Sequence, residues 1–246
     1  MATVSAYLRP ATLGDALACL DLPGAVVVGG GTKVNAARTL EPVVVIDLQG
    51  LHIDGIERAG EHGLLVGATA TFQRLADDAR VPATIREAAR REQPSTLRAL
   101  ATVGGLVATA DPSSELLATL LVHDGVVTLT GRDGRLSVEL AAVLGDGTVL
   151  AGRIITAVTV ETGGVTSVAR TARTRADQPI VAAVARRTPD GQRRLALTGV
   201  AAVPVLVAPT PDAAAGLEPP GDFRGSTEYR RVLAGVLARR ALEGVG

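Results

Sequence analysis

The sequence predicts an α+β fold, because short β-branched apolar runs alternate with segments that show the helical spacing of apolar residues. Hydrophobic residues make up 47% of the 246 residues, which is typical of a folded protein of one or two domains. The clearest predicted strand is 154–161. The clearest predicted helix is 228–242, where apolar residues recur at helical spacing and arginines lie off the apolar stripe.

In the N-terminal half, apolar runs and turn residues predict short elements in quick succession. Thr12 is placed to cap a helix that ends before Pro23-Gly24. The remaining expected elements are strands at 25–28, 43–48, 52–56 and 63–67, a helical or irregular segment at 33–38, and helices that begin at Thr71, Pro82 and Ser114.

In the C-terminal half, a hairpin at 126–130 and 135–138 precedes the strand at 154–161. The composition changes beyond Gly163-Gly164, which predicts one domain at 1–163, with subdomains at about 1–58 and 59–163, and another at 164–246. Further expected elements are strand-to-helix or strand pairs at 167–173 and 180–187, a turn before 194–200, a strand at 203–207, and a short helix within 210–221. The expected buried face of the last helix carries Val232, Leu233, Val236, Leu237 and Leu242.

Composition excludes several function classes. Twenty-five basic and 25 acidic side chains give zero formal net charge, which disfavours nucleic acid and anionic membranes as partners. Aromatic residues are 2% of the chain, too few for a platform that stacks single-stranded bases. Cys19 is alone, and His52, His62 and His123 lack ligand spacing, so no disulfide or metal site is expected. No stretch is long and apolar enough for a membrane span, and a cytoplasmic location is expected.

Two glycine-rich turns, Val26–Lys33 and Ala101–Leu106, are the strongest functional signal. Glycine permits positive φ and lets a ligand approach bare backbone N–H groups. The first turn is not a dinucleotide Gly-x-Gly-x-x-Gly motif, because Val34 stands at the third glycine position, and it is not a Walker A loop. Each turn alone is equally typical of a tight turn without a ligand. Together they predict a phosphate-bearing cofactor held between two loops.

Several segments resemble one known family in chain order. Gly29-Gly30-Gly31-Thr32 is similar to its Ala-Gly-Gly-Thr loop, Ala101–Gly105 to its Ala-Thr-Ile-Gly-Gly loop, and Asp111–Leu116 to its Pro-x-x-Asp segment. Further similar segments are Tyr7–Leu20, Val45–Leu48, Val66–Thr71, Arg173–Asp177 and Asp222–Arg230. On these residues the chain resembles the FAD-binding medium subunit of the molybdenum hydroxylases, the carbon monoxide dehydrogenase and xanthine dehydrogenase family.

The resemblance implies a two-subdomain FAD-binding domain of the PCMH (vanillyl-alcohol-oxidase) type, followed by a small α/β C-terminal domain of the CO dehydrogenase flavoprotein type. It implies an oxidoreductase subunit in which FAD passes electrons from a 2Fe–2S small subunit, itself fed by a molybdopterin large subunit, to an external acceptor. Backbone amides of both loops would hold the FAD diphosphate. The implied cofactor-binding residues are Gly29, Gly30, Gly31, Thr32, Lys33, Val34, Thr102, Val103, Gly104, Gly105, Asp111 and Glu115.

The chain also departs from the family pattern. Lys33 and Leu106 replace the usual Asp or Ser and the usual Asn, and Lys33 either pairs with a phosphate or points to solvent. The acidic pair Asp111 and Glu115 either accepts hydrogen bonds from cofactor hydroxyls or caps a helix. The aromatic-rich segment of the family is missing, since Ala141–Leu150 contains no aromatic residue. These departures keep open the alternative of a non-catalytic family member that acts as an assembly subunit. A stand-alone flavin oxidase is disfavoured.

Overall fold

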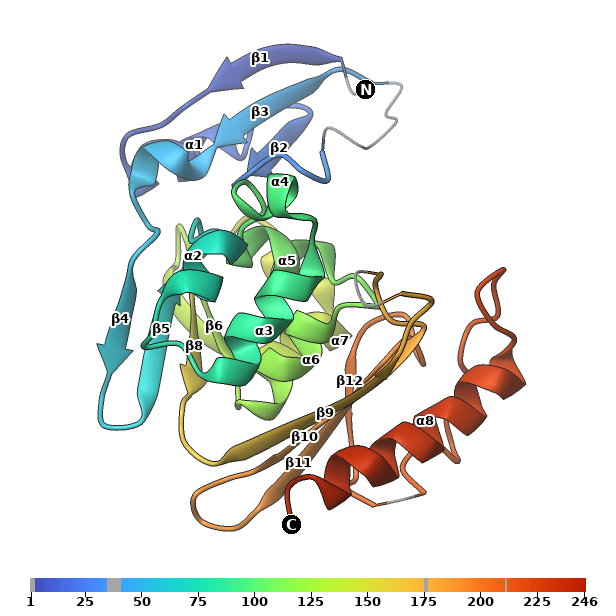
Figure 1. Cartoon of the computed structure of the whole chain (residues 1–246). Helices are drawn as coiled ribbons and strands as arrows, with labels where there is room; N and C mark the ends of the chain where they lie inside the picture. The colour runs from blue at the N-terminus through green and yellow to red at the C-terminus, as the bar shows by residue number, and fades with distance from the viewer. Residues whose placement is uncertain (1–2, 35–40, 175–176, 211) are drawn as a thin grey trace.

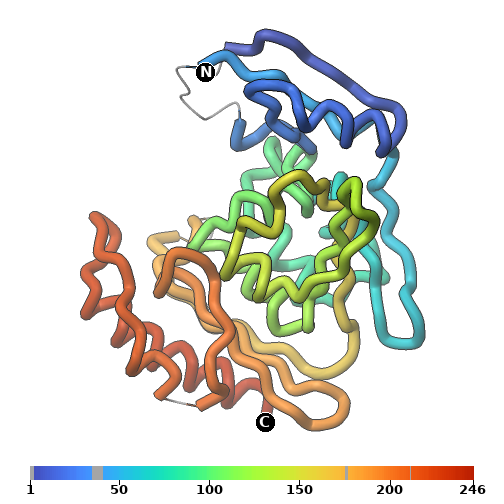
Figure 2. The backbone as a smooth tube through the Cα atoms, turned by 180° about the vertical axis from the view of Figure 1, so that it is seen from behind, coloured from blue at the N-terminus to red at the C-terminus, as the bar shows by residue number. Residues whose placement is uncertain are grey.

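A computed structural model describes residues 3–34, 41–174, 177–210 and 212–246, which form three sheets. Figures 1 and 2 show the N-terminal sheet and the C-terminal sheet at opposite ends, with the middle sheet and its helices between them. The predicted α+β class is confirmed. Part of the predicted segment 33–38 lies outside the described residues, and the described Lys33 and Val34 form a turn.

The N-terminal sheet is parallel, with the order β1-β3-β2. Thr12 caps α1 as predicted, since its hydroxyl oxygen accepts the N–H of Asp15 at 3.2 Å. The strand expected at 52–56 is wrong: His52 adopts a left-handed φ of 52°, and pairing starts only at Ile56. The elements of this unit are β1 (Val4–Leu8), α1 (Leu13–Cys19), β2 (Ala25–Val28), β3 (Val43–Asp47) and the 3-10 helix η1 (Leu48–Leu51).

The middle sheet is antiparallel, with the order β4-β5-β8-β6-β7, and helices α2, α3, α5 and α6 cover one face of it (Figure 1). Leu64 and Val158 of the sheet and Leu75 and Ile85 of the helices are almost fully buried in one core. Its strands are β4 (Ile56–Ala59), β5 (Gly63–Gly67), β6 (Val126–Gly131), β7 (Gly134–Glu139) and β8 (Ile154–Glu161). Its helices are α2 (Phe72–Asp77), α3 (Ala83–Glu92), α4 (Ser95–Arg98), α5 (Val103–Thr109), α6 (Glu115–Val122), α7 (Leu140–Gly145) and η2 (Gly147–Leu150).

The C-terminal sheet is an antiparallel meander, so the segments near 167–173 and 180–187 are strand pairs and not strand-to-helix units. Within 212–221 the chain forms turns where a short helix was expected. The elements are β9 (Val165–Thr171), β10 (Val181–Arg187), β11 (Arg193–Thr198), β12 (Val205–Val207) and α8 (Thr227–Glu243).

Helix α6 joins the middle and C-terminal parts. All eight of its residues are buried, because it packs between the middle sheet and the C-terminal sheet. Val184 of β10 and Ala196 of β11 therefore belong to the same core as α6. The proposed domain boundary at 163 lies between the middle and C-terminal sheets. A second hydrophobic core, between the C-terminal sheet and α8, lies entirely beyond it, while Val184 and Ala196 pack across it into the core of the middle part.

The predicted buried face of α8 is partly wrong. Val232 is 60% exposed and Val236 is exposed, whereas Ala234, Ala238 and Ala241 are fully buried. The small alanine side chains let α8 lie close to β10, and the side chains of β10 fill the space between the helix and the strand. The buried face of α8 is therefore the face that carries the alanines. Leu237 and Leu242 lie on the buried face as predicted.

The contact between the middle and C-terminal parts contains a buried guanidinium. Arg186 is 1% exposed and donates to the carbonyl oxygens of Gly163, at 2.8 and 3.0 Å, and of Val122, at 3.1 Å. It also pairs with the carboxylate of Asp124 at 3.1 Å. A buried charge is tolerated only when it is paired in this way. Through these bonds Arg186 holds the linker at 163 against the end of α6.

We expect Arg186→Met to lower the free energy of unfolding by about 3 kcal/mol, because it leaves buried acceptors without a donor. The measurement is urea unfolding followed by circular dichroism. The matched control is Arg187→Met at the exposed neighbouring position, which should change stability by less than about 0.5 kcal/mol. Equal effects of the two substitutions would contradict the assigned role of Arg186.

Candidate functional site

The first glycine loop, Gly29–Val34, follows the carboxyl end of the parallel strand β2, a common place for ligand sites in parallel sheets. Gly31 has a φ of +71°, which favours glycine. Among the residues that the structure describes, no acceptor takes a hydrogen bond from the N–H groups of this loop. These half-buried donors are therefore available to an anionic ligand.

The two glycine turns lie against one another. A Cβ atom on Gly29 would stand 2.4 Å from the hydroxyl oxygen of Thr102, and a Cβ on Gly30 would stand 1.6 Å from the carbonyl oxygen of Leu100. Any side chain at Gly30 would force the segments apart. The predicted convergence of the two turns is therefore confirmed, and glycine is what permits it.

The predicted amide cradle of the second turn, Thr102–Gly105, is wrong for three of its four residues. Val103, Gly104 and Gly105 form the first turn of α5, and their N–H groups already have acceptors within the protein. Val103 donates to Ala70 O at 3.0 Å, and Gly104 donates to Ala68 O at 2.8 Å. Gly105 donates to the hydroxyl oxygen of the capping residue Thr102 at 3.3 Å. The second turn therefore contributes a wall to the site and not a second set of free amides.

Two hollows that share lining residues flank the contact between the turns, with cavity volumes of about 100 and 210 Å³. Their shared lining residues are Val27, Gly29, Thr102, Gly105 and Ala108. The first hollow also contains Gly30, Gly31, Thr32, Lys33, Val34 and Asp111. The second is mostly apolar and also contains Leu48, Gly104, Leu150, Arg153, Ile154 and Ile155.

The charged residues expected at the site fall into two groups. The ammonium of Lys33 lies 3.2 Å from the carboxylate of Asp111, so this pair joins the first loop to the segment after α5. Glu115 is 2% exposed and pairs with Arg91 at 2.6 Å and Arg170 at 2.9 Å. Both hollows are lined by other residues, and the expected role of Glu115 in cofactor binding stays a prediction. Val103 also lines neither hollow and is a core residue.

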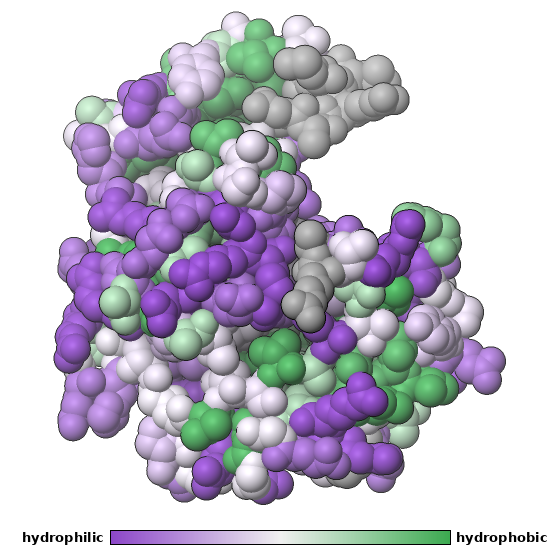
Figure 3. All heavy atoms as spheres, viewed as in Figure 1, coloured by the Kyte–Doolittle hydropathy of each residue, from purple (hydrophilic) through white to green (hydrophobic). Residues whose placement is uncertain are grey.

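A wider cleft, with a volume of about 530 Å³, shares Lys33, Glu92 and Gln93 with the first hollow and extends toward the C-terminal part. Figure 3 shows the surface hollowed between the lobe that carries the N-terminal sheet and the lobe that carries α8. Basic side chains outnumber acidic ones here, which makes the cleft positive in a protein of zero net charge. The lining residues are Lys33, Arg91, Glu92, Gln93, Pro94, Arg173, Asp177, Gln178, Phe223 and Arg224.

The sequence analysis missed Glu92, which lies where the first hollow meets the cleft. Its carboxylate accepts the N–H of Leu116 at 3.1 Å and is 5% exposed, so it caps α6 from another helix. Burial raises the pKa of the Glu92 carboxyl to about 7, and the carboxylates of Asp111 and Glu115 add to the shift, while hydrogen bonds from Leu116 and Ser114 oppose it. No local pattern marks this residue, because it appears as one charge on an amphipathic helix.

Glu92→Gln should reveal this shift as a pH dependence of stability. The unfolded chain loses the proton near pH 4.5, whereas the folded chain keeps it up to about pH 7. The stability of the wild type relative to the variant should therefore fall between these pH values, by up to about 3 kcal/mol, and stay constant above them.

The measurement is the difference in free energy of unfolding between the wild type and Glu92→Gln, from urea unfolding at several pH values. Burial lowers the pKa of His123 to about 4, so His123 gives the opposite slope: its contribution is lost as pH falls from 6.5 through 4. Because His123 is present in both proteins, its effect cancels in the difference. A difference that does not change with pH would show that Glu92 is not held protonated.

None of the described helices is both long and apolar enough to cross a bilayer. Within the same residues, no group of three or more histidine, cysteine, aspartate or glutamate side chains is arranged to hold a metal ion.

Comparison with known proteins agrees with the geometry. The chain is 30% identical over 229 residues to YgfM of Escherichia coli (strain K12), which is described as uncharacterized, covering 87% of this chain and 85% of that protein. It is 28% identical over 274 residues to the carbon monoxide dehydrogenase medium chain of Afipia carboxidovorans, covering 96% and 95%.

The fold also matches solved structures over its whole length. The Cu,Mo-CO dehydrogenase in its cyanide-inactivated form matches with a TM-score of 0.88 and 25% identity, covering 100% of this chain and 98% of that chain. Quinoline 2-oxidoreductase from Pseudomonas putida shares the fold, with a TM-score of 0.84 and 22% identity, covering 99% and 96%.

Residues 2–160 match the FAD-binding domain in molybdopterin dehydrogenases. FAD as the cofactor and the oxidoreductase class are thereby confirmed, and the unpaired amides of the first loop fit a diphosphate. The chain belongs to the family of FAD-binding domains in molybdopterin dehydrogenases.

Proposed function

We propose that the chain is the FAD-binding electron-transfer subunit of a molybdenum hydroxylase-type complex. Its partners would be a 2Fe–2S small subunit and a molybdopterin large subunit, and electrons would pass through FAD to an external acceptor in the cytoplasm. The observation that carries the proposal is the first glycine loop, whose amides have no acceptor among the described residues and lie at a close contact of two subdomains. The chain that carries this loop resembles a CO dehydrogenase medium chain over almost its whole length.

The first loop supports a specific role for each of its parts. FAD, when bound, supplies the ring that accepts and releases electrons, and the protein binds and orients it. The amides of Gly29–Val34 would donate to the diphosphate. Lys33, held by Asp111, would bring a positive charge beside it. Thr102, Gly104 and Gly105 would line the path through van der Waals contacts. Thr102 lies against Gly29 of the first loop, and a Cβ on Gly104 would meet Ala68.

The two sides of the loop differ in a way that favours one orientation of the cofactor. The apolar hollow beside Leu48 and Ile154 suits a part of the cofactor that does no chemistry, the adenosine. The cleft beside Lys33 is open toward the surface and suits the flavin ring, which has to exchange electrons with groups outside the chain.

A second candidate function is a non-catalytic assembly subunit. Leu106, which removes a polar group from the first hollow, and the segment 141–150, which forms α7 and η2 without an aromatic ring, favour this candidate. The two functions differ in one observable: in the purified complex, substrate bleaches the flavin absorbance only if the chain carries electrons.

Gly30→Ala tests the role of the first loop. Because its Cβ would overlap the carbonyl oxygen of Leu100, the two turns must separate. Overpacking of this kind costs roughly 1–3 kcal/mol, and we expect FAD affinity to fall by roughly 5- to 150-fold. The measurement is the ratio of flavin to protein absorbance after purification, with an FAD titration of the apoprotein.

Gly235→Ala is the matched control, since a Cβ at this position of α8 would meet nothing within 4 Å. It should bind FAD as the wild type does. A wild-type protein that takes up no FAD, even with its partner subunits, would refute the proposed function. Full FAD binding by Gly30→Ala would refute the role of the loop contact.

A further inference from the structure

Phe223 is the most exposed large apolar side chain of the described residues, at 92% exposure. It is one of four aromatic residues in the chain, with Phe72, Tyr7 and Tyr229. A single exposed apolar residue needs no explanation by itself. Two features are unusual: several hydrogen bonds hold the backbone around Phe223, and the ring lines a cleft.

The turn that carries Phe223 is braced on both sides. On one side, the Asp222 carboxylate accepts the N–H of Arg224 at 2.8 Å and a guanidinium hydrogen bond from Arg230 at 2.6 Å. On the other side, the Arg224 guanidinium donates to the carbonyl oxygens of Gln178, at 2.8 Å, and Pro179, at 3.2 Å. The ring therefore stands on a fixed support, which limits the entropy lost when it makes a contact.

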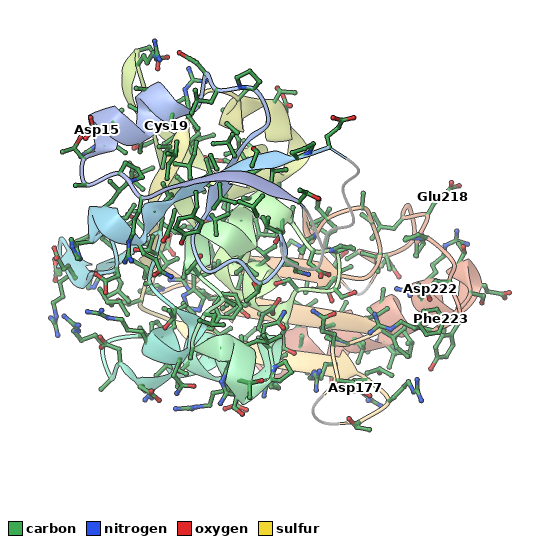
Figure 4. All side chains as sticks on the ribbon, turned by 90° about the horizontal axis from the view of Figure 1, so that it is seen from above. Asp15, Cys19, Asp177, Glu218, Asp222 and Phe223 are labelled. Carbon is green, nitrogen blue, oxygen red and sulfur yellow. The ribbon has the colours of Figure 1, made fainter. Side chains whose placement is uncertain are left out.

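The support places the ring in the cleft that begins at the first glycine loop. Phe223 and Lys33 line this cleft from opposite parts of the molecule, together with Gln93 and Pro94 of the middle part. Figure 1 shows that the segment before α8 extends from the start of that helix toward the N-terminal sheet. Figure 4 shows Phe223 beside Asp222, on the side of the molecule away from Cys19. Among the described residues that line the cleft, Phe223 is the one with an aromatic ring.

We propose that Phe223 is the aromatic wall of the flavin site, and that its ring packs against the isoalloxazine of FAD bound at the first loop. This inference rests on the proposed function and on the orientation that places the flavin ring in the cleft. Phe72 lines the first hollow but is almost fully buried in the core of the middle part. An offset stack of two rings excludes water from one face of the flavin.

The test uses the full-length protein loaded with FAD and compares Phe223→Leu with Phe223→Tyr. A ring packed on one face of the flavin shields that face, so Phe223→Leu should make the bound flavin severalfold more accessible to quenching by iodide. Phe223→Tyr should keep the low iodide access of the wild type and should lower the emission per bound flavin, because a stacked phenol, unlike a phenyl ring, donates an electron to the excited flavin. Loss of the stack should weaken FAD binding by roughly two- to tenfold.

Tyr229→Leu is the matched control, because it removes another exposed aromatic ring from the same segment but not from the cleft lining. It should leave emission and iodide access unchanged. Wild-type iodide access in Phe223→Leu, with FAD still bound, or undiminished emission in Phe223→Tyr, would overturn the inference while leaving the proposed function intact. If Phe223→Leu loses FAD, rescue by tyrosine supports the inference and failure of rescue overturns it. A wild-type protein without FAD would refute the proposed function, and this inference with it.

Discussion

The contact between two stretches of backbone, at Gly29-Gly30 and at Leu100–Thr102, is the constraint on which the site depends. With less than 2 Å between a Cβ at Gly30 and the Leu100 carbonyl oxygen, no side chain fits. This contact brings the N-terminal unit against the middle part and leaves a hollow on each side of the joint. The free amides of the first loop lie at the same joint, so the packing contact and the proposed diphosphate site are parts of one feature.

The ionisable residues divide according to whether they hold the fold or face the cleft. Glu115 and Arg186 are buried and paired, and they tie α6 to helix α3 and to the C-terminal sheet. Lys33 and Asp111 pair at the surface of the first hollow, where a phosphate would lie beside them. Glu92 belongs to both groups, because it caps α6 and also lines the cleft. A buried carboxyl of this kind adds little negative charge beside an anionic ligand when it is protonated.

Much of the site could be predicted from the sequence, but the part played by each turn could not. The glycines at 29–31 predict exposed backbone, and among the described residues no acceptor takes a hydrogen bond from the N–H groups there. The glycines at 104 and 105 have the same local pattern but lie inside α5, where helix capping and the carbonyl oxygens of Ala68 and Ala70 use the N–H groups. Phe223 and Glu92 could not be placed at the cleft, because residues from the distant first loop form its other wall.

The sequence by itself determined the order of most strands and helices, the cap at Thr12, the family and the cofactor, because these follow from local patterns and from motifs in chain order. Tertiary structure alone decided which face of α8 is buried, which carboxylates are structural, and which amides stay free. The physical reason is that burial and hydrogen bonding depend on what lies opposite in space. The same glycine, valine or glutamate has a different role when a carbonyl oxygen, a guanidinium or an open cleft lies beside it.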